Sequence, residues 1–452
     1  MTTEIAGAGF TDEEQEPPKR RIYRSDKGRF YHDAMALDLM DLRSARFIEG
    51  IPAIWDELEG RYRMRYAGWD AAIVDLCSGT TQQNRKEVAS YLSIIGERHN
   101  QGDPHLIACA NGVINPWVKD YDALDDEGHS VSFVFNTPES DIPNVLPVTW
   151  DPNAYDEATD KALDAFACGD AGTRLNLEEI LAACIYRGRE IQQMAVLVGD
   201  GGNGKSVYLD MLSKMLGPDN VTSIDLRDVG KRFMQAPLMG KLANIGDDIA
   251  DGFIESAPLS IIRKVVTGNP ITIEEKYHPP YDARPYATMV FSANVFPRIA
   301  DSTQGMLDRF HAVRFAADFR HNPEARITNI SELLDNDLSR SYLLNLALRR
   351  LPDLVRRGGF TPTPYSEAER GSLLLDNDSV AYWIDTNGIT ARYADGRTVE
   401  GLYREYADFC GSAGRKPVEQ RTFTRRVNKR LGTRTAKDIL DNSRQVRGFH
   451  MG

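Results

Sequence analysis

The chain has 452 residues, of which 42% are hydrophobic and 27% are charged, and its net charge is −12. This length allows two to four domains with a core in each, and the composition is that of a soluble globular protein. The acidic N-terminus has no signal-peptide core, and no apolar run approaches the roughly 18 residues of a membrane helix. From these features we expect a cytoplasmic protein.

The cysteines indicate a reducing compartment, because they are odd in number and scattered. They are Cys77, Cys109, Cys168, Cys184 and Cys410. No two of them have Cys-x-x-Cys spacing, and the chain has no His-x-x-x-His pair. We therefore expect no zinc module.

Residues 1–24 are polar and are predicted to form a disordered arm, and residues 25–150 to form one mixed α/β domain. The predicted elements are a helix over 33–48, a helix over 87–95, a strand over 106–110 and a strand over 132–135. Three aromatic residues, Tyr62, Tyr66 and Trp69, fit a hydrophobic core better than base stacking.

Residues 151–190 are predicted to form a helical collar with helices over 156–166 and 177–186. Either Thr173 or Asn176 is a candidate cap for the second helix, since both have side chains that accept hydrogen bonds from backbone N–H groups.

The central domain, residues 191–350, opens with the order of a phosphate-binding P-loop: an apolar strand, a glycine-rich turn and an amphipathic helix. The turn consists of Gly199, Asp200, Gly201, Gly202, Asn203 and Gly204. Its backbone N–H groups, together with the start of the helix, would bind the phosphates of ATP. Lys205 would reach the β- and γ-phosphates, and Ser206 would hold Mg²⁺. The alternative is a glycine-rich turn with a surface lysine.

A mostly apolar run ends in the acidic pair Asp247-Asp248, 42 residues after Lys205. We assign Asp247 to the Mg²⁺ and Asp248 to the attacking water, and the reverse assignment stays open. A β-rich run from Tyr286 delivers Asn294 at its tip, where a neutral amide can bond the γ-phosphate or the water. Arg309 is the first choice for an arginine finger supplied to a neighbouring copy, and Arg314 the second.

Between these parts, residues 271–275 alternate and precede Pro279-Pro280, which predicts a protruding hairpin or loop. Its tip carries Lys276 and His278, which would grip the phosphate backbone of DNA, and Lys264 would assist them. The alternative is a solvated loop.

A linker is predicted over residues 351–372, followed by a last domain over residues 373–452. Its predicted helices span 379–386, 401–410 and 420–431. Residues 401–452 hold twelve Lys and Arg against five Asp and Glu, a charge of +7 that leaves −19 for the rest. Three helices with a β-like tail favour a winged helix, and Arg425, Arg426 and Lys429 on the last helix are its predicted DNA contacts.

The chain resembles the helicase portion of the phage/plasmid primase–helicase family, which is related to the poxvirus-type primase helicase and belongs to superfamily 3. The residues that carry the resemblance are Ala110-Asn111-Gly112-Val113-Ile114, the "G-x-G-x-NGKS" form of 199–206, Asp247-Asp248, Val266-Thr267-Gly268, Asn294 followed by Pro297, Arg309, Tyr403–Tyr406 and Phe423. Two departures are Lys264, which is near but not at the family's lysine position, and Asp308, where the family often has a second arginine.

The resemblance implies an α/β fold with a P-loop AAA+-like ATPase core, a pre-helicase domain and a winged-helix domain. It also implies an ATP- and Mg²⁺-dependent replicative DNA helicase of a phage or mobile element, working as a hexameric ring in the cytoplasm of a bacterial host. Single-stranded DNA would pass through the channel, and the C-terminal domain would contact duplex origin DNA. We find no primase catalytic domain, so a separate primase would make primers. The alternatives are a nucleotide-dependent origin-binding or scaffold protein without unwinding activity, and an ATPase that remodels protein.

Overall fold

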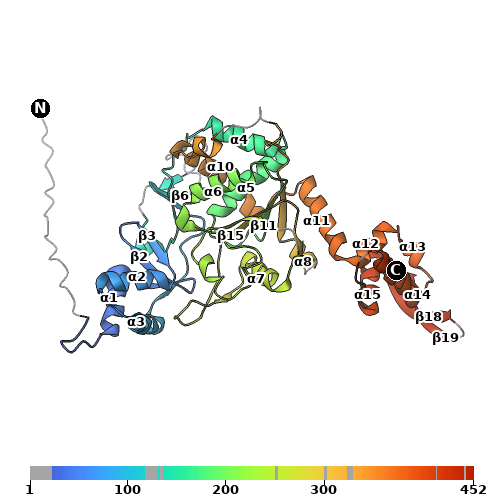
Figure 1. Ribbon diagram of the computed structural model, residues 1–452, viewed down its shortest axis with the longest axis horizontal. Helices are drawn as coiled ribbons and strands as arrows, with labels where there is room; N and C mark the ends of the chain where they lie inside the picture. The colour runs from blue at the N-terminus through green and yellow to red at the C-terminus, as the bar shows by residue number, and fades with distance from the viewer. Residues whose placement is uncertain are drawn as a thin grey trace, which may run out of the picture.

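The computed structural model describes residues 23–117, 130–132, 136–249, 253–299, 303–322, 329–413, 415–441 and 444–452. Residues 1–22 of the predicted arm and residues 133–135 of a predicted strand lie outside these ranges. Figure 1 shows an N-terminal unit in blue beside a central unit, and a C-terminal lobe joined to the central unit by helix α11 (Pro364–Asn377).

A five-stranded parallel sheet forms the middle of the central unit. Its strands lie in the order β10 (Val221–Thr222), β11 (Ala243–Ile249), β15 (Thr288–Ala293), β9 (Met194–Val198) and β17 (Phe310–Arg314). All five residues of β9 are buried, as expected for an inner strand of a sheet covered on both faces. From β9 the chain passes to one side of the sheet and later returns to β17 on the other. The carboxyl end of β9 is therefore the place where such sheets bind ligands.

Helices cover the two faces of this sheet (Figure 1). On one face lie α4 (Glu157–Ala167), α5 (Ala171–Ile185), α6 (Lys205–Leu216) and α10 (Asp337–Arg357). On the other lie α7 (Ser256–Val266) and a hairpin of β13 (Ile271–Ile273) and β14 (Tyr281–Ala283). The cap of α5 is Asp170, not Thr173 or Asn176 as predicted, because the helix begins several residues before the expected start.

The N-terminal unit has helices packed on a sheet of order β3-β2-β1-β4. Its elements are α1 (His32–Arg43), β1 (Arg46–Ile48), β2 (Ile51–Asp56), β3 (Arg61–Met64), α2 (Tyr66–Leu76), α3 (Gln82–Ile95) and β4 (Arg98–His99). The predicted helix over 33–48 is too long, because Ser44 takes the left-handed conformation and ends α1 before β1. Tyr62, Tyr66 and Trp69 are at most 2% exposed, so their core position is confirmed.

A second small sheet, of order β7-β6-β5-β8, connects this unit to the central one. Its strands are β5 (Ile107–Cys109), β6 (Gly112–Asn115), β7 (Ser130–Ser132) and β8 (Val145–Leu146). Ala110 and Asn111 form the turn that joins β5 to β6.

The C-terminal lobe contains the three predicted helices and a β-hairpin around an aromatic core that includes Trp383, Tyr406 and Phe423. Its elements are α12 (Ser379–Thr386), α13 (Ala391–Ala394), α14 (Val399–Ser412), α15 (Gln420–Leu431), β18 (Thr433–Asp441) and β19 (Arg444–Met451). Much of the predicted linker over 351–372 is helical, because α10 continues through Pro352 and α11 starts at Pro364.

The remaining elements are short. They are β12 (Phe253–Ile254), β16 (Arg298–Ile299), α8 (Gln304–Leu307), α9 (Ile330–Leu333) and 3-10 turns at Pro138–Ser140, Pro218–Asn220 and Ala236–Leu238. None of the described helices combines the length and the apolarity that crossing a lipid bilayer requires.

Candidate functional site

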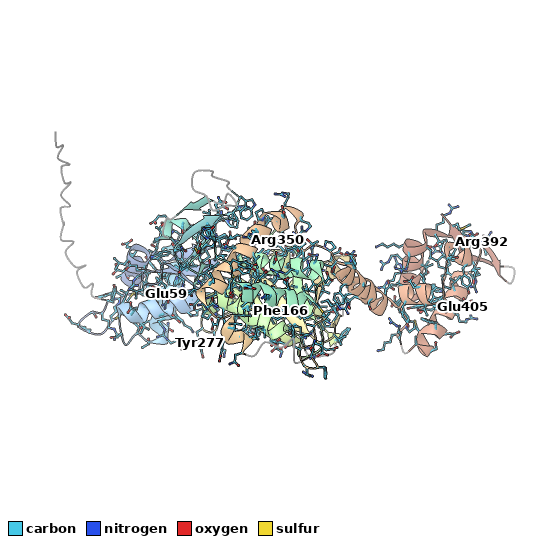
Figure 2. The ribbon with its side chains drawn as sticks, turned by 90° about the horizontal axis from the view of Figure 1, so that it is seen from above. Glu59, Phe166, Tyr277, Arg350, Arg392 and Glu405 are labelled. Atoms are coloured by element: carbon cyan, nitrogen blue, oxygen red, sulfur yellow. The ribbon has the colours of Figure 1, made fainter. Side chains whose placement is uncertain are left out.

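The glycine-rich turn connects the carboxyl end of β9 to the start of α6. Gly204 has a φ of +94°, and a Cβ there would collide with the ring of Phe166 (Figure 2). A Cβ on Gly199 would collide with the carbonyl oxygen of Phe315. The N-cap residue Gly204 has no side chain to cap α6, although the N–H of Lys205 lies 3.5 Å from Oδ1 of Asn203, and the start of this helix suits an anion.

Lys205 is 7% exposed and directs its ammonium group back into this turn. Its Nζ donates to the carbonyl oxygens of Gly199 and Asp200, the latter at 3.2 Å, and lies 3.3 Å from Oδ1 of Asn203. The side chain of Asn203 is buried and donates to the carbonyl oxygen of Phe315 at 3.1 Å. Of Asn203, only the backbone N–H is therefore available for the predicted phosphate contact. Its side chain links the turn to the residue that follows β17.

Asp247 at the end of β11 lies beside Ser206 at the start of α6. The Ser206 hydroxyl is 3.3 Å from Oδ2 of Asp247, and the hydroxyl of Ser292 on β15 donates to Oδ1 of Asp247 at 2.6 Å. Gly246 faces Phe291 and Ile249 faces Ala293, so the two acidic residues stand opposite Ser292 alone. Such a bulge turns side chains out of the regular alternation. The side chain of Asp248 lies outside the described residues.

The donor set at this point suits Mg²⁺, because it offers a hydroxyl and an exposed carboxylate. Mg²⁺ usually takes one or two protein oxygens and completes its shell with water and substrate phosphates. Across the described ranges, no group of three or more His, Cys, Asp and Glu side chains is placed to hold a metal. The arrangement thus fits a cation that arrives with a phosphate ligand.

Asn294 is exposed just beyond the end of β15, on the wall of an open cavity of about 920 Å³. The glycine-rich turn forms part of the same wall, through Gly199 to Gly201. Arg314, at the carboxyl end of β17, also lines the cavity, with its guanidinium 5.7 Å from the centre of the Tyr365 ring.

Arg320 is a site residue that the sequence did not reveal. A Cβ on Gly201 would lie 2.8 Å from its Nη2, and the neighbouring Phe319 N–H donates to the carbonyl oxygen of Gly202 at 3.0 Å. Arg320 therefore lies against the glycine-rich turn. This contact arises from the tertiary fold, and no motif spacing in the sequence predicts it. Ser292 was also missed, although it lies on β15 only two residues before Asn294.

Arg309 lies at the amino ends of β9 and β17, whereas the glycine-rich turn lies at the carboxyl end of β9. Its Nη1 donates to the carbonyl oxygen and to Oε1 of Gln192, at 3.2 and 2.8 Å, and its own carbonyl accepts from the N–H of Met194 at 2.8 Å. Met194 begins β9, whereas the glycine-rich turn follows the end of that strand. Arg309 is thus separated from the turn of its own chain by the length of β9.

The predicted hairpin is present, but its tip lies against the N-terminal unit. The side chain of His278 is 8% exposed, its ring stacks on Tyr66 at 4.3 Å, and its Nε2 lies 3.3 Å from Oδ2 of Asp70. This covering is at odds with the predicted DNA contact of His278. Lys276 at the hairpin tip and Lys264 in the last turn of α7 are exposed.

The basic helix α15 has two distinct faces. Arg426 pairs with Asp378 at 3.0 Å and so packs within the lobe. Arg421, Arg425 and Lys429 recur at every fourth position and are exposed, and no carboxylate of the described residues pairs with them. Arg421 and Arg425 line a cavity of about 650 Å³ beside β19. Of the three predicted DNA contacts, Arg425 and Lys429 are free to meet a ligand and Arg426 is engaged.

Comparisons with known proteins give three findings. Residues 197–309, from β9 to Arg309, match the "Family of unknown function (DUF5906)". No curated protein matches the chain. Among solved structures, the A form apo structure of the NrS-1 C-terminal region is similar, with 12% identity and a TM-score of 0.49, covering 90% of this chain and 96% of that one. An apo structure of NrS-1 residues 305–718 has 13% identity and a TM-score of 0.47, with coverages of 90% and 95%.

Proposed function

We propose that the cavity beside the glycine-rich turn binds ATP with Mg²⁺ and that the chain hydrolyses it. The observation that carries this proposal is the 3.3 Å approach of Ser206 to Asp247 at the start of α6. A hydroxyl and a carboxylate from separate elements meet there beside an uncapped helix start and the ammonium of Lys205. These are the groups that bind a triphosphate and its cation.

Each residue has a distinct part in the proposed reaction. The backbone N–H groups of the turn hold the phosphates, and the ammonium of Lys205 exchanges its carbonyl partners for phosphate oxygens. Ser206 and Asp247 would hold Mg²⁺, which neutralises charge on the phosphate oxygens. Asn294 orients the attacking water, and we assign Asp248 as the acceptor of its proton. Arg320 and Arg314 line the same space and add positive charge where negative charge develops.

We further propose that hydrolysis drives a replicative DNA helicase with an AAA+-like core and a C-terminal winged helix. The exposed cations of α15 support a DNA-binding lobe, since phosphate contacts need unpaired Lys and Arg. The place of Arg309 supports a ring: it lies away from its own glycine-rich turn, which suits a role at the triphosphate of a neighbouring copy rather than at its own. Head-to-tail contacts of that kind close into rings such as a hexamer.

A second candidate is a nucleotide-dependent origin-binding or scaffold protein that does not unwind DNA. The covered ring of His278 favours it, because a motor hairpin needs exposed groups that track a DNA strand. Lys276 alone is left exposed among the two predicted tip residues.

The test is ATP hydrolysis and strand separation by the whole chain on a forked duplex at low salt. The helicase proposal expects hydrolysis that rises with single-stranded DNA, together with unwinding. Hydrolysis without unwinding would support the origin-binding or scaffold protein. A rate of hydrolysis that does not change when DNA is added would support an ATPase that remodels protein. Mixing Arg309→Ala with Lys205→Ala subunits should restore some hydrolysis, because one complete shared site forms. No restoration at any mixing ratio would contradict the shared site.

A further inference from the structure

A second cavity, of about 340 Å³, lies between β3 and the residues that precede β11. β3 is the edge strand of its sheet, and Arg61, Arg63 and Arg65 alternate along it and just beyond it. Alternate residues of a strand share one face. Lys241 meets them from the central unit. Glu59, labelled on the N-terminal side in Figure 2, also lines the cavity.

The cations of this cavity are unevenly neutralised. Four of them share the lining with two carboxylates, Glu59 and Asp219, and the other two carboxylates that pair with them, Asp56 and Glu275, lie outside the lining. Arg61 is well paired, with Glu59 and Asp219 each at 2.6 Å. Arg63 pairs with Asp56, which is not a lining residue, at 2.7 Å and with Glu59 at 3.2 Å.

Arg65 and Lys241 are the incompletely paired members. The nearest carboxylate to Arg65 is that of Glu275 at a loose 3.6 Å, and Nε of Arg65 is buried without a partner among the described residues. Lys241 donates to the backbone carbonyl of Asp219, and no carboxylate of the described residues pairs with it. Burial lowers the pKa of Lys241, and Arg61 and Arg65 lower it further, against the opposing effect of Asp219.

The backbone of Arg65 gives a second, independent observation. Its φ and ψ are 79° and 163°, a region that is essentially restricted to glycine. An arginine held there forms part of the cavity wall at a conformational cost. Strain of this kind is concentrated at functional sites.

We propose that this cavity binds a phosphate group between Arg65 and Lys241. The group is either a phosphodiester of a nucleic-acid strand or part of a free phosphate compound. The site is separate from the glycine-rich turn and does not depend on the proposed ATP hydrolysis. Lys241 precedes β11, whose other end carries Asp247, so the two anion sites lie at opposite ends of one strand.

The first test is acylation of lysines in the whole wild-type chain, followed by mass spectrometry, with Lys27 and Lys161 as exposed internal references. An oligonucleotide or pyrophosphate that occupies the cavity should slow the modification of Lys241 severalfold relative to the references. Protection by the oligonucleotide alone assigns the site to strand phosphates, and protection by pyrophosphate alone assigns it to a free compound. Absence of protection by either would overturn the proposal.

The second test uses Arg65→Gly, which removes the guanidinium and suits the observed φ, with Lys27→Gln as a control that removes an exposed charge from the same unit. The thermal midpoint of Arg65→Gly should equal or exceed that of the wild type, whereas its Kd for the protecting ligand should rise about tenfold. For an oligonucleotide, the salt slope should also fall by about 0.7 for each phosphate that the variant no longer neutralises. A Kd and a slope equal to those of the control would overturn the proposal. Lys241→Gln serves if Arg65→Gly does not fold.

Discussion

Ser292 and Asp247 are joined across neighbouring parallel strands, the serine hydroxyl donating to Oδ1 of the carboxylate at 2.6 Å. Oδ2 of the same carboxylate faces Ser206 on α6. Ser292 thus fixes the direction in which Asp247 presents its other oxygen. The β-bulge opposite Ser292 makes this possible, because it lets an acidic residue at the end of β11 turn toward the start of α6.

The Ser292→Ala variant should keep its fold and lose roughly tenfold in Mg²⁺-dependent ATP hydrolysis, because partners that orient a metal ligand typically contribute 10- to 100-fold. The rate of ATP hydrolysis measured over a range of Mg²⁺ concentrations tests this loss. Ser213→Ala is the control, since that hydroxyl donates to the carbonyl oxygen of Leu209 within α6. Equal Mg²⁺ dependence in both variants would remove Ser292 from the site.

The Gly204→Ala variant should destabilise the chain and abolish nucleotide binding. A side chain at a φ of +94° costs about 1–2 kcal/mol, and the added Cβ would also collide with Phe166. Thermal unfolding measures the loss, with Gly305→Ala as the control, because a Cβ there meets open space. Adding Phe166→Leu should recover part of the stability. A Gly204→Ala variant as stable as the control would show that the turn does not need glycine there.

The stability of the central unit should fall in acid through His311. Burial, aided by Arg357, lowers the pKa of His311 to about 4, and its Nε2 lies 2.9 Å from Oδ1 of Asn176. The unfolded chain binds this proton near pH 6.5, so the contribution is complete above pH 6.5 and is lost as the pH falls toward 4. By pH 4.5 the free energy of unfolding has fallen by about 2–3 kcal/mol through this residue.

Urea unfolding at pH 7 and pH 4.5 measures this effect in the wild type and in His311→Gln, which cannot take up the proton. The variant should lose about 2–3 kcal/mol less between the two pH values than the wild type does. Identical losses would mean that His311 is protonated in the folded chain.

Local signals in the sequence predicted the elements well where burial and turn chemistry act along the chain. The apolar run of β9, the glycine-rich turn and the helices of the C-terminal lobe follow from periodicity and glycine placement. The structure also places Ser206 beside Asp247, and Asn294 on the cavity wall that the turn shares.

The features that the sequence did not predict depend on tertiary contacts or on the conformation of a single residue. His278 has the position of a free hairpin tip, but Tyr66, 212 residues earlier in the chain, covers its ring. Arg320 reaches the turn from a segment with no motif of its own. Residues 46–48 continue a helical pattern yet pair as β1, because a left-handed residue ends the helix before them.

Direct binding of ATP to the whole chain, with and without Mg²⁺, tests the central claim most directly, because it requires neither DNA nor a ring. Lys205→Ala is compared with Lys214→Ala, which removes an equal charge from the same helix at a residue paired with Asp210 and Asp335. We predict Mg²⁺-dependent binding by the wild type and by Lys214→Ala, and affinity lower by about 100-fold in Lys205→Ala, since that variant cannot form charge-assisted bonds to phosphate. Equal ATP affinity in the two variants would contradict a triphosphate site at the glycine-rich turn.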